Sequence, residues 1–325
     1  MAPRYRAVQR LRFPYDEVQA GSLPRTMTSA TPHPELPVLG THRRPWPTLL
    51  SWVVIVVVSA LILVLIGVKI IRSETEPGID PVALASPAVV ATLGKVPASA
   101  HKAALANPSP LIAHLHRQGG SLMTATTVSG MTLPLVVFVG TESCMACAAE
   151  RWPLIVALSR FGTFSNLGAV TSSDLVASPS LQSFTFRGSK YRSNYFILHA
   201  FELTGERPDE LGNYPVTASL DPQAAAAIHD DDVVAASGLV AQPGGFKPEQ
   251  MYPFLDLAHR AVLVGTQLPP AVLIGRARAD VADALADPTT QVSGPILTAA
   301  NALTVELCAI THGLPAKVCR AYGGS

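Results

Sequence analysis

The chain has 325 residues, with 24 Lys and Arg against 23 Asp and Glu, so its formal net charge is +1. This balance argues against a nucleic-acid-binding protein held by a broad basic field. Hydrophobic residues make up 48% of the chain and charged residues 14%, which is too apolar for a mainly disordered protein.

Residues 1–48 form a basic arm with seven arginines and three acids. Its Pro, Thr and Arg residues follow no period, which predicts a disordered segment. The charge of the arm differs in sign from that of the remaining chain, where acids outnumber bases. We therefore treat the arm as a region separate from the folded part.

Residues 49–68 form an apolar run of twenty residues without a charge. A helix of that length spans roughly 30 Å, the thickness of a bilayer's hydrocarbon core. Trp46 and Trp52 lie near one end, where indole rings favour the interface. Arg43 and Arg44 flank the same end, so the positive-inside rule predicts a cytoplasmic arm. We expect a single-pass anchor in the cell membrane with an extracytoplasmic C-terminal region, in preference to a core helix or a cleaved signal peptide.

Residues 69–110 are rich in Pro, Ala, Ser and Val. Prolines interrupt any long helix there, which predicts a linker that holds the domain off the membrane. One short helix is expected around Ala98–Ala106. The folded extracytoplasmic domain is predicted for residues 111–325.

A continuous apolar, β-branched run closed by glycine, Leu133–Gly140, predicts a fully buried strand. A short turn leads to Cys144 and Cys147, and a helical pattern continues to about Arg160. Pro153 falls inside this helix and is expected to kink it. The predicted later elements are strands at 167–172, 184–186 and 195–203, an insertion with some helix at 204–250, a proline-led β-hairpin at 252–265 and a helix at 295–310. The strands at 184–186 and 195–203 are expected to form a hairpin. This order implies an α/β sheet.

Two cysteines that open a helix after a buried strand have a physical logic. Cys144 is placed at the helix N-terminus, where unpaired N–H groups and the helix dipole favour a thiolate. Cys147 follows about one turn later, close enough to attack a mixed disulfide. A zinc site is an alternative, but it normally needs a second ligand pair, and Cys308 and Cys319 form no such motif.

A strand, a Cys-x-x-Cys helix and a later proline-led hairpin resemble the thioredoxin fold. More specifically, residues 144–152 and 158–167 resemble the family catalogued as domain of unknown function 929, membrane-anchored thioredoxin-like proteins of prokaryotes. The resemblance implies a thioredoxin-like fold with an insertion and a redox-type motif, without a demonstrated substrate. The chain departs from its relatives at Ser143 and at Met145-Ala146, where they often have an aromatic residue and a proline. No acid occupies residues 135–139, where thioredoxins keep one; Glu142 is nearer the motif but is expected to be exposed.

In thioredoxin folds a cis-proline faces the cysteine motif and holds the partner's backbone. The resemblance makes Pro253 the candidate for this role, with Pro179 as the rival, while an ordinary trans proline remains the alternative for Pro253. Arg151 shares a helix face with Cys147 and can stabilise a thiolate, but a solvated or salt-bridged arginine beside Glu150 is the preferred interpretation. Trp152 is interpreted as core packing.

Cys308 and Cys319 are expected to form a structural disulfide that pins the C-terminus, since an outside compartment permits it. The favoured pairing is therefore Cys144 with Cys147 and Cys308 with Cys319. A second redox pair that relays electrons stays open.

The leading hypothesis is thiol–disulfide exchange with secreted or membrane proteins, in which Cys144 attacks, Cys147 resolves and Pro253 binds the partner's backbone. A non-catalytic binding or assembly module with an inert disulfide is the second hypothesis. The third is a Cu(I) site that uses both cysteines and Met145. No cofactor, resident metal or nucleic-acid partner is expected under the leading hypothesis.

Overall fold

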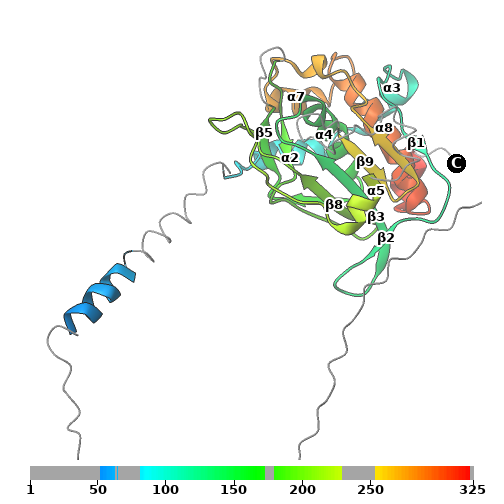
Figure 1. Ribbon diagram of the computed structural model, residues 1–325. Helices are drawn as coiled ribbons and strands as arrows, with labels where there is room; N and C mark the ends of the chain where they lie inside the picture. Colours follow the sequence, from blue (N-terminus) through cyan, green and yellow to red (C-terminus); the bar gives the residue numbers. More distant parts are fainter. Residues whose placement is uncertain (1–51, 63, 65–80, 173–178, 229–252, 323–325) are drawn as a thin grey trace, which may run out of the picture. The chain divides into compact units, whose positions relative to one another are not determined.

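The structure is a computed structural model that describes residues 52–62, 64, 81–172, 179–228 and 253–322. The chain divides into two compact units, Met1–Gly67 and Val68–Ser325. In the first unit Trp52–Ile62 is an apolar helix, drawn in blue in Figure 1. Its side chains are exposed throughout, Trp52 by 58%. The predicted arm 1–48 and the remainder of the predicted span 49–68, apart from residue 64, lie outside the described residues.

The second unit is built around strand β3 (Thr132–Gly140), which the apolar run predicted. β3 pairs in parallel with β8 (Ile197–Glu202) and antiparallel with β9 (Phe254–Leu257). β9 turns back into β10 (Ala261–Val264), so the predicted hairpin is confirmed. These strands lie in the order β8-β3-β9-β10 (Figure 1).

Two short strands extend this sheet. β1 (His116–Arg117) pairs with β10, and β2 (Thr124–Thr126) pairs with the first part of β3, both antiparallel. Side chains alternate across β3, so that Val136 and Phe138 join one apolar cluster while Leu135, Val137 and Val139 join the other. Both faces of β3 are therefore buried, which explains why its sequence shows no alternation of apolar and polar residues.

Helix α4 (Met145–Leu158) begins directly after the turn that follows β3. Every residue from Cys147 to Leu158 is buried, and the helix continues through Pro153. It packs against α8 (Ser293–Ile310), which matches the helix predicted at 295–310. Among the described residues α8 is the helix long and apolar enough to cross a membrane, but 67% of it is buried inside this unit. We therefore assign α8 to the core.

Two small two-stranded antiparallel sheets lie between α4 and β8 in the chain. β4 (Gly162–Ser165) pairs with β7 (Lys190–Ser193), and β5 (Gly168–Thr171) pairs with β6 (Gln182–Thr185). The predicted hairpin of strands 184–186 and 195–203 is thus wrong, although strands occur close to both positions. Gly168 on β5 is closely packed, because a Cβ there would lie 2.5 Å from methyl carbons of both Thr185 on β6 and Val82.

The folded unit begins earlier than the sequence predicts. Helices α2 (Pro87–Leu93) and α3 (Ala98–Ala106) lie in the predicted linker, and α3 has the bounds that the sequence indicated. Leu93 and Ala100 are buried in the main core, and Leu84 forms a β-bridge with Gly168. Because Leu93 and Ala100 pack in the core, the described part of the predicted linker, residues 81–110, belongs to the folded unit. Residues 69–80 of the linker lie outside the described residues.

The predicted insertion at 204–250 is described as far as residue 228. It contains α5 (Pro222–Ile228), whose Ala224 and Ala227 pack on the face of the sheet opposite α4 and α8. Residues 229–250 lie outside the described part of the chain. The remaining elements are η2 (Pro270–Leu273), α7 (Arg278–Ala284) and α9 (Ala316–Tyr322).

Candidate functional site

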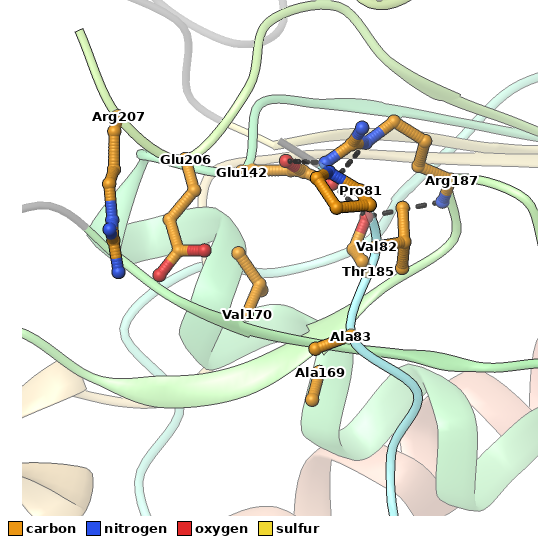
Figure 2. Close-up of a pocket in the computed structure, with 10 residues that line it drawn as sticks. All are labelled: Pro81, Val82, Ala83, Glu142, Ala169, Val170, Thr185, Arg187, Glu206 and Arg207. Carbon is orange, nitrogen blue, oxygen red and sulfur yellow. Dashed lines mark hydrogen bonds and ion pairs between the residues drawn. The ribbon is translucent and has the colours of Figure 1, made fainter. Parts of the chain in front are cut away.

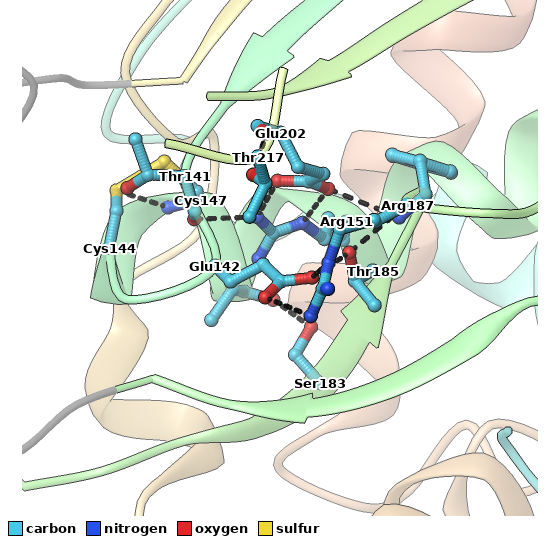
Figure 3. A network of polar contacts seen from close by, with 12 residues as sticks. Thr141, Glu142, Cys144, Cys147, Arg151, Ser183, Thr185, Arg187, Glu202 and Thr217 are labelled. Atoms are coloured by element: carbon cyan, nitrogen blue, oxygen red, sulfur yellow. Dashed lines mark hydrogen bonds and ion pairs between the residues drawn. A yellow bond between two sulfur atoms is a disulfide. The ribbon is translucent and has the colours of Figure 1, made fainter. Parts of the chain in front are cut away.

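The cysteine motif caps helix α4. Cys144 is the N-cap residue, and its sulfur accepts a hydrogen bond from the Cys147 backbone N–H at 3.0 Å. The two residues form a disulfide, with their Cα atoms 5.2 Å apart (Figure 3). Cys144 is partly exposed, whereas Cys147 is fully buried. Of the two residues, Cys144 is therefore the more accessible from solvent.

The end of β3 pairs with the strand that directly follows Pro253. Gly140 closes the strand, and a Cβ there would lie 3.0 and 3.1 Å from two Phe138 ring carbons and 3.4 Å from the Cys147 Cβ, so the strand ends beside the start of α4. In the β3–β9 register Val139 pairs with Phe254, and the next step along both strands sets Gly140 opposite Pro253. The Pro253 carbonyl accepts a hydrogen bond from Gly265 at 2.8 Å.

The Tyr252–Pro253 peptide bond involves Tyr252, which lies outside the described residues, so the predicted cis geometry stays a prediction. The rival Pro179 is exposed and precedes β6, a strand of a two-stranded sheet rather than of the central one.

Arg151 is salt-bridged, as the preferred interpretation allowed, but it is buried rather than solvated and its partner is Glu202 and not the neighbouring Glu150. Its side chain is fully buried, and its guanidinium donates to the Glu202 carboxylate on β8, through Nε at 2.9 Å. It also donates to the Thr141 carbonyl at 2.7 Å, in the turn before the motif. Burial raises the pKa of Glu202, and the neighbouring Arg151 opposes that rise. Arg151 therefore joins the second turn of α4 to both the parallel strand and the motif turn.

Glu142 is buried, so the expectation that it is exposed is wrong. Its side chain is 0% exposed because Arg187 and Thr185 cover and bind it. Arg187 donates to both carboxylate oxygens, at 2.8 and 2.9 Å, and the Thr185 hydroxyl donates at 2.7 Å. Figure 3 shows this pair beside the Arg151–Glu202 pair. The sequence offered little sign of it, since Arg187 lies 45 residues further along the chain.

A third buried acid, Glu150, also escaped the sequence analysis. It lies on α4 three residues after Cys147, and burial raises its pKa to about 8. The backbone N–H of Gln267 donates to its carboxylate at 2.7 Å. The residues around Glu150 in the helix are largely apolar, and this was the available signal in the sequence. The period of a helix does not reveal, however, that α4 is buried on all sides.

A cavity of about 300 Å³ lies next to the Glu142–Arg187 pair (Figure 2). Its floor is apolar and includes Ala169 and Val170, while Glu206 and Arg207 stand at the end away from Arg187. The cavity therefore adjoins the motif turn through Glu142.

Trp152 is fully buried and contacts the Phe184 ring edge-on, which confirms its interpretation as core. Cys308 and Cys319 form the second disulfide, which joins α8 to α9. Among the described residues no three His, Cys, Asp or Glu side chains gather closely enough to hold a metal ion.

Residues 125–227 match the model of the family described as Domain of unknown function (DUF929), which confirms the family resemblance of the region that bears the cysteines. The match covers about a third of the chain and ends before Pro253 and the C-terminal disulfide. No curated protein and no solved structure matches the chain.

Proposed function

We propose that the chain is a membrane-tethered, extracytoplasmic, thioredoxin-like protein that exchanges thiols and disulfides with secreted or membrane proteins. Cys144 is the attacking residue, Cys147 the resolving residue, and Pro253 the residue that binds the partner's backbone. The observation that carries the proposal is the combination at the end of β3. The partly exposed Cys144 caps a helix, the buried Cys147 is bonded to it, and a proline directly precedes the adjacent antiparallel strand.

The strand order supports a thioredoxin-like fold. In such a fold the strand before the motif has a parallel neighbour on one side and an antiparallel hairpin on the other. β3 has β8 and the β9–β10 hairpin in these positions, and α8 follows the hairpin in the chain. The two small two-stranded sheets then form additions between α4 and β8, and residues 204–250 form the insertion before the β9–β10 hairpin.

The chemistry balances without a cofactor. The Cys144 thiolate attacks one sulfur of a client disulfide, forms a mixed disulfide and releases the other client sulfur as a thiolate, which takes up a proton. The Cys147 thiol then loses its proton and attacks the Cys144 sulfur, which releases the second client thiolate. The client gains two electrons and the motif loses them; the reverse sequence oxidises a client.

The membrane tether is supported by the exposed apolar helix Trp52–Ile62 and by the flanking arginines Arg43 and Arg44. If the domain is extracytoplasmic, an impermeant thiol reagent applied to intact cells labels Cys144 after mild reduction. Labelling that requires cell lysis contradicts this orientation.

A redox titration of the Cys144–Cys147 pair separates exchange from the alternatives. The Met145-Ala146 dipeptide, in place of the residues common in relatives, favours an inert module as the second candidate. Exchange predicts a reduction potential above about −300 mV, the range of labile disulfides. A pair that stays oxidised well below that potential supports the inert module, and thiols shielded by a bound soft metal support the Cu(I) site.

A further inference from the structure

The turn between β3 and α4 is held on both sides by hydrogen bonds. The Glu142 backbone N–H donates to the Thr204 carbonyl at 3.0 Å, just beyond β8. The Thr141 carbonyl accepts from Arg151 at 2.7 Å, so the turn is also joined to α4. Cys144 follows this turn directly. Its position therefore depends on how firmly residues 141–143 are held.

The Glu142 side chain provides the third attachment. Its carboxylate accepts the Thr185 hydroxyl from β6 and two N–H groups of Arg187, as a paired fork. The Arg187 backbone N–H in turn donates to the Thr185 hydroxyl at 3.1 Å. Because the side chain of Arg187 is 19% exposed and that of Glu142 is 0% exposed, this is a largely buried ion pair two residues before Cys144.

The charges around the turn cancel only while Arg187 is present. Arg151 and Glu202 neutralise each other, and Glu206 and Arg207 carry opposite charges at the far end of the cavity. Removal of Arg187 leaves the Glu142 carboxylate with a neutral hydroxyl as its remaining side-chain hydrogen-bond donor among the described residues. A buried negative charge near a thiol disfavours the thiolate. Without the two hydrogen bonds from Arg187 to Glu142, the turn would also hold Cys144 less firmly.

We propose that Arg187 is a positioning residue for Cys144, which acts through Glu142 by fixing the motif turn and by cancelling the buried charge beside it. This inference rests on the proposed function only for the role of Cys144 as the attacking thiol. Glu142 and Arg187 also line the cavity of about 300 Å³ (Figure 2).

The test measures the pH dependence of alkylation of Cys144 in the full chain. A Cys147→Ala background leaves Cys144 as the reactive thiol while the Cys308–Cys319 disulfide stays closed. The variants are Arg187→Ala, Arg187→Lys and Glu142→Gln, with Arg192→Ala as the matched control. Arg192 is exposed on β7, so its removal changes the net charge equally without touching the turn.

We expect Arg187→Ala to raise the midpoint of the alkylation profile by about one pH unit, which slows alkylation about tenfold at any pH well below both midpoints. Arg187→Lys should retain most of the reactivity, and Arg192→Ala should behave like the parent. Glu142→Gln leaves the arginine uncompensated and should lower the midpoint; it also keeps the test decisive if Arg187→Ala does not fold.

A double variant with Glu142→Gln and Arg187→Ala removes both charges and should return the midpoint toward that of the parent. Unchanged profiles in folded Arg187→Ala and Glu142→Gln proteins overturn the proposal, because a merely structural pair would lower thermal stability without moving the midpoint. The assay needs no client protein, so a negative result here is distinguishable from a failure of thiol–disulfide exchange.

Discussion

Glu150 makes the stability of the domain depend on pH in an unusual direction. A carboxyl group normally has a pKa of 4.5, and burial within α4 raises that of Glu150 to about 8. Between these values the folded protein retains a proton that the unfolded chain releases. The free energy of unfolding therefore contains a contribution that is fully present below about pH 4.5 and is lost as the pH rises through 8.

The size of this contribution follows from the two pKa values. Each unit of difference corresponds to about 1.4 kcal/mol, so the interval from 4.5 to about 8 corresponds to about 5 kcal/mol. The hydrogen bond from the Gln267 N–H favours the charged carboxylate, and the pKa of about 8 is the result of burial and this opposing hydrogen bond together. Glu150→Gln keeps the shape of the side chain and removes the titration.

The assay is urea denaturation of the full chain in detergent micelles at several pH values. At each pH the free energy of unfolding of the parent is subtracted from that of Glu150→Gln, which cancels the contributions of the other carboxylates. This difference should grow by several kcal/mol in favour of the variant between pH 5 and pH 8. The exposed Glu210→Gln variant is the control and should show a constant difference. A difference for Glu150→Gln that is equally flat across this range would refute the assignment of a neutral buried acid.

Two further predictions concern stability. Arg151→Ala leaves the buried Glu202 carboxylate unpaired and should lower the free energy of unfolding, measured by urea denaturation, by about 3–5 kcal/mol. Arg151→Met combined with Glu202→Leu should lower it much less. Equal losses in the two proteins would argue against an unpaired charge as the cause. Replacing Cys308 and Cys319 together by Ala should cost about 3 kcal/mol yet leave exchange intact, as calorimetry and a disulfide-exchange assay would show. Loss of exchange in the folded double variant would instead mean that this pair relays electrons.

The elements with a strong local signal were predictable from the sequence. The unbroken apolar run of β3 is typical of a strand buried on both faces, and the glycine and cysteines after it indicate where α4 begins. The proline before β9 likewise predicted the hairpin with β10. These elements are determined by residues close together in the chain, so their sequence pattern is sufficient to predict them.

Features that depend on distant partners were not predictable. Glu142 and Arg151 look like surface charges in the sequence, and only the return of β6 and β8 to the motif buries them. The close packing of Gly168 against Thr185 and Val82 likewise carries no local sign in the sequence. Residues 81–110 resemble a linker because prolines separate their helices, although each short helix presents apolar residues to the core.

Trapping of mixed disulfides is the most direct test of the central claim. Cells that produce Cys147→Ala should accumulate client proteins bound to Cys144 as complexes that reductant dissolves, because no resolving thiol remains to release them. Cys144→Ala should trap few or none, since Cys147 is fully buried. Pro253→Thr in the Cys147→Ala background should lengthen the lifetime of the complexes if the proline faces the motif. Absence of complexes in all of these variants, with the proteins folded and correctly oriented, would contradict thiol–disulfide exchange and favour the inert module.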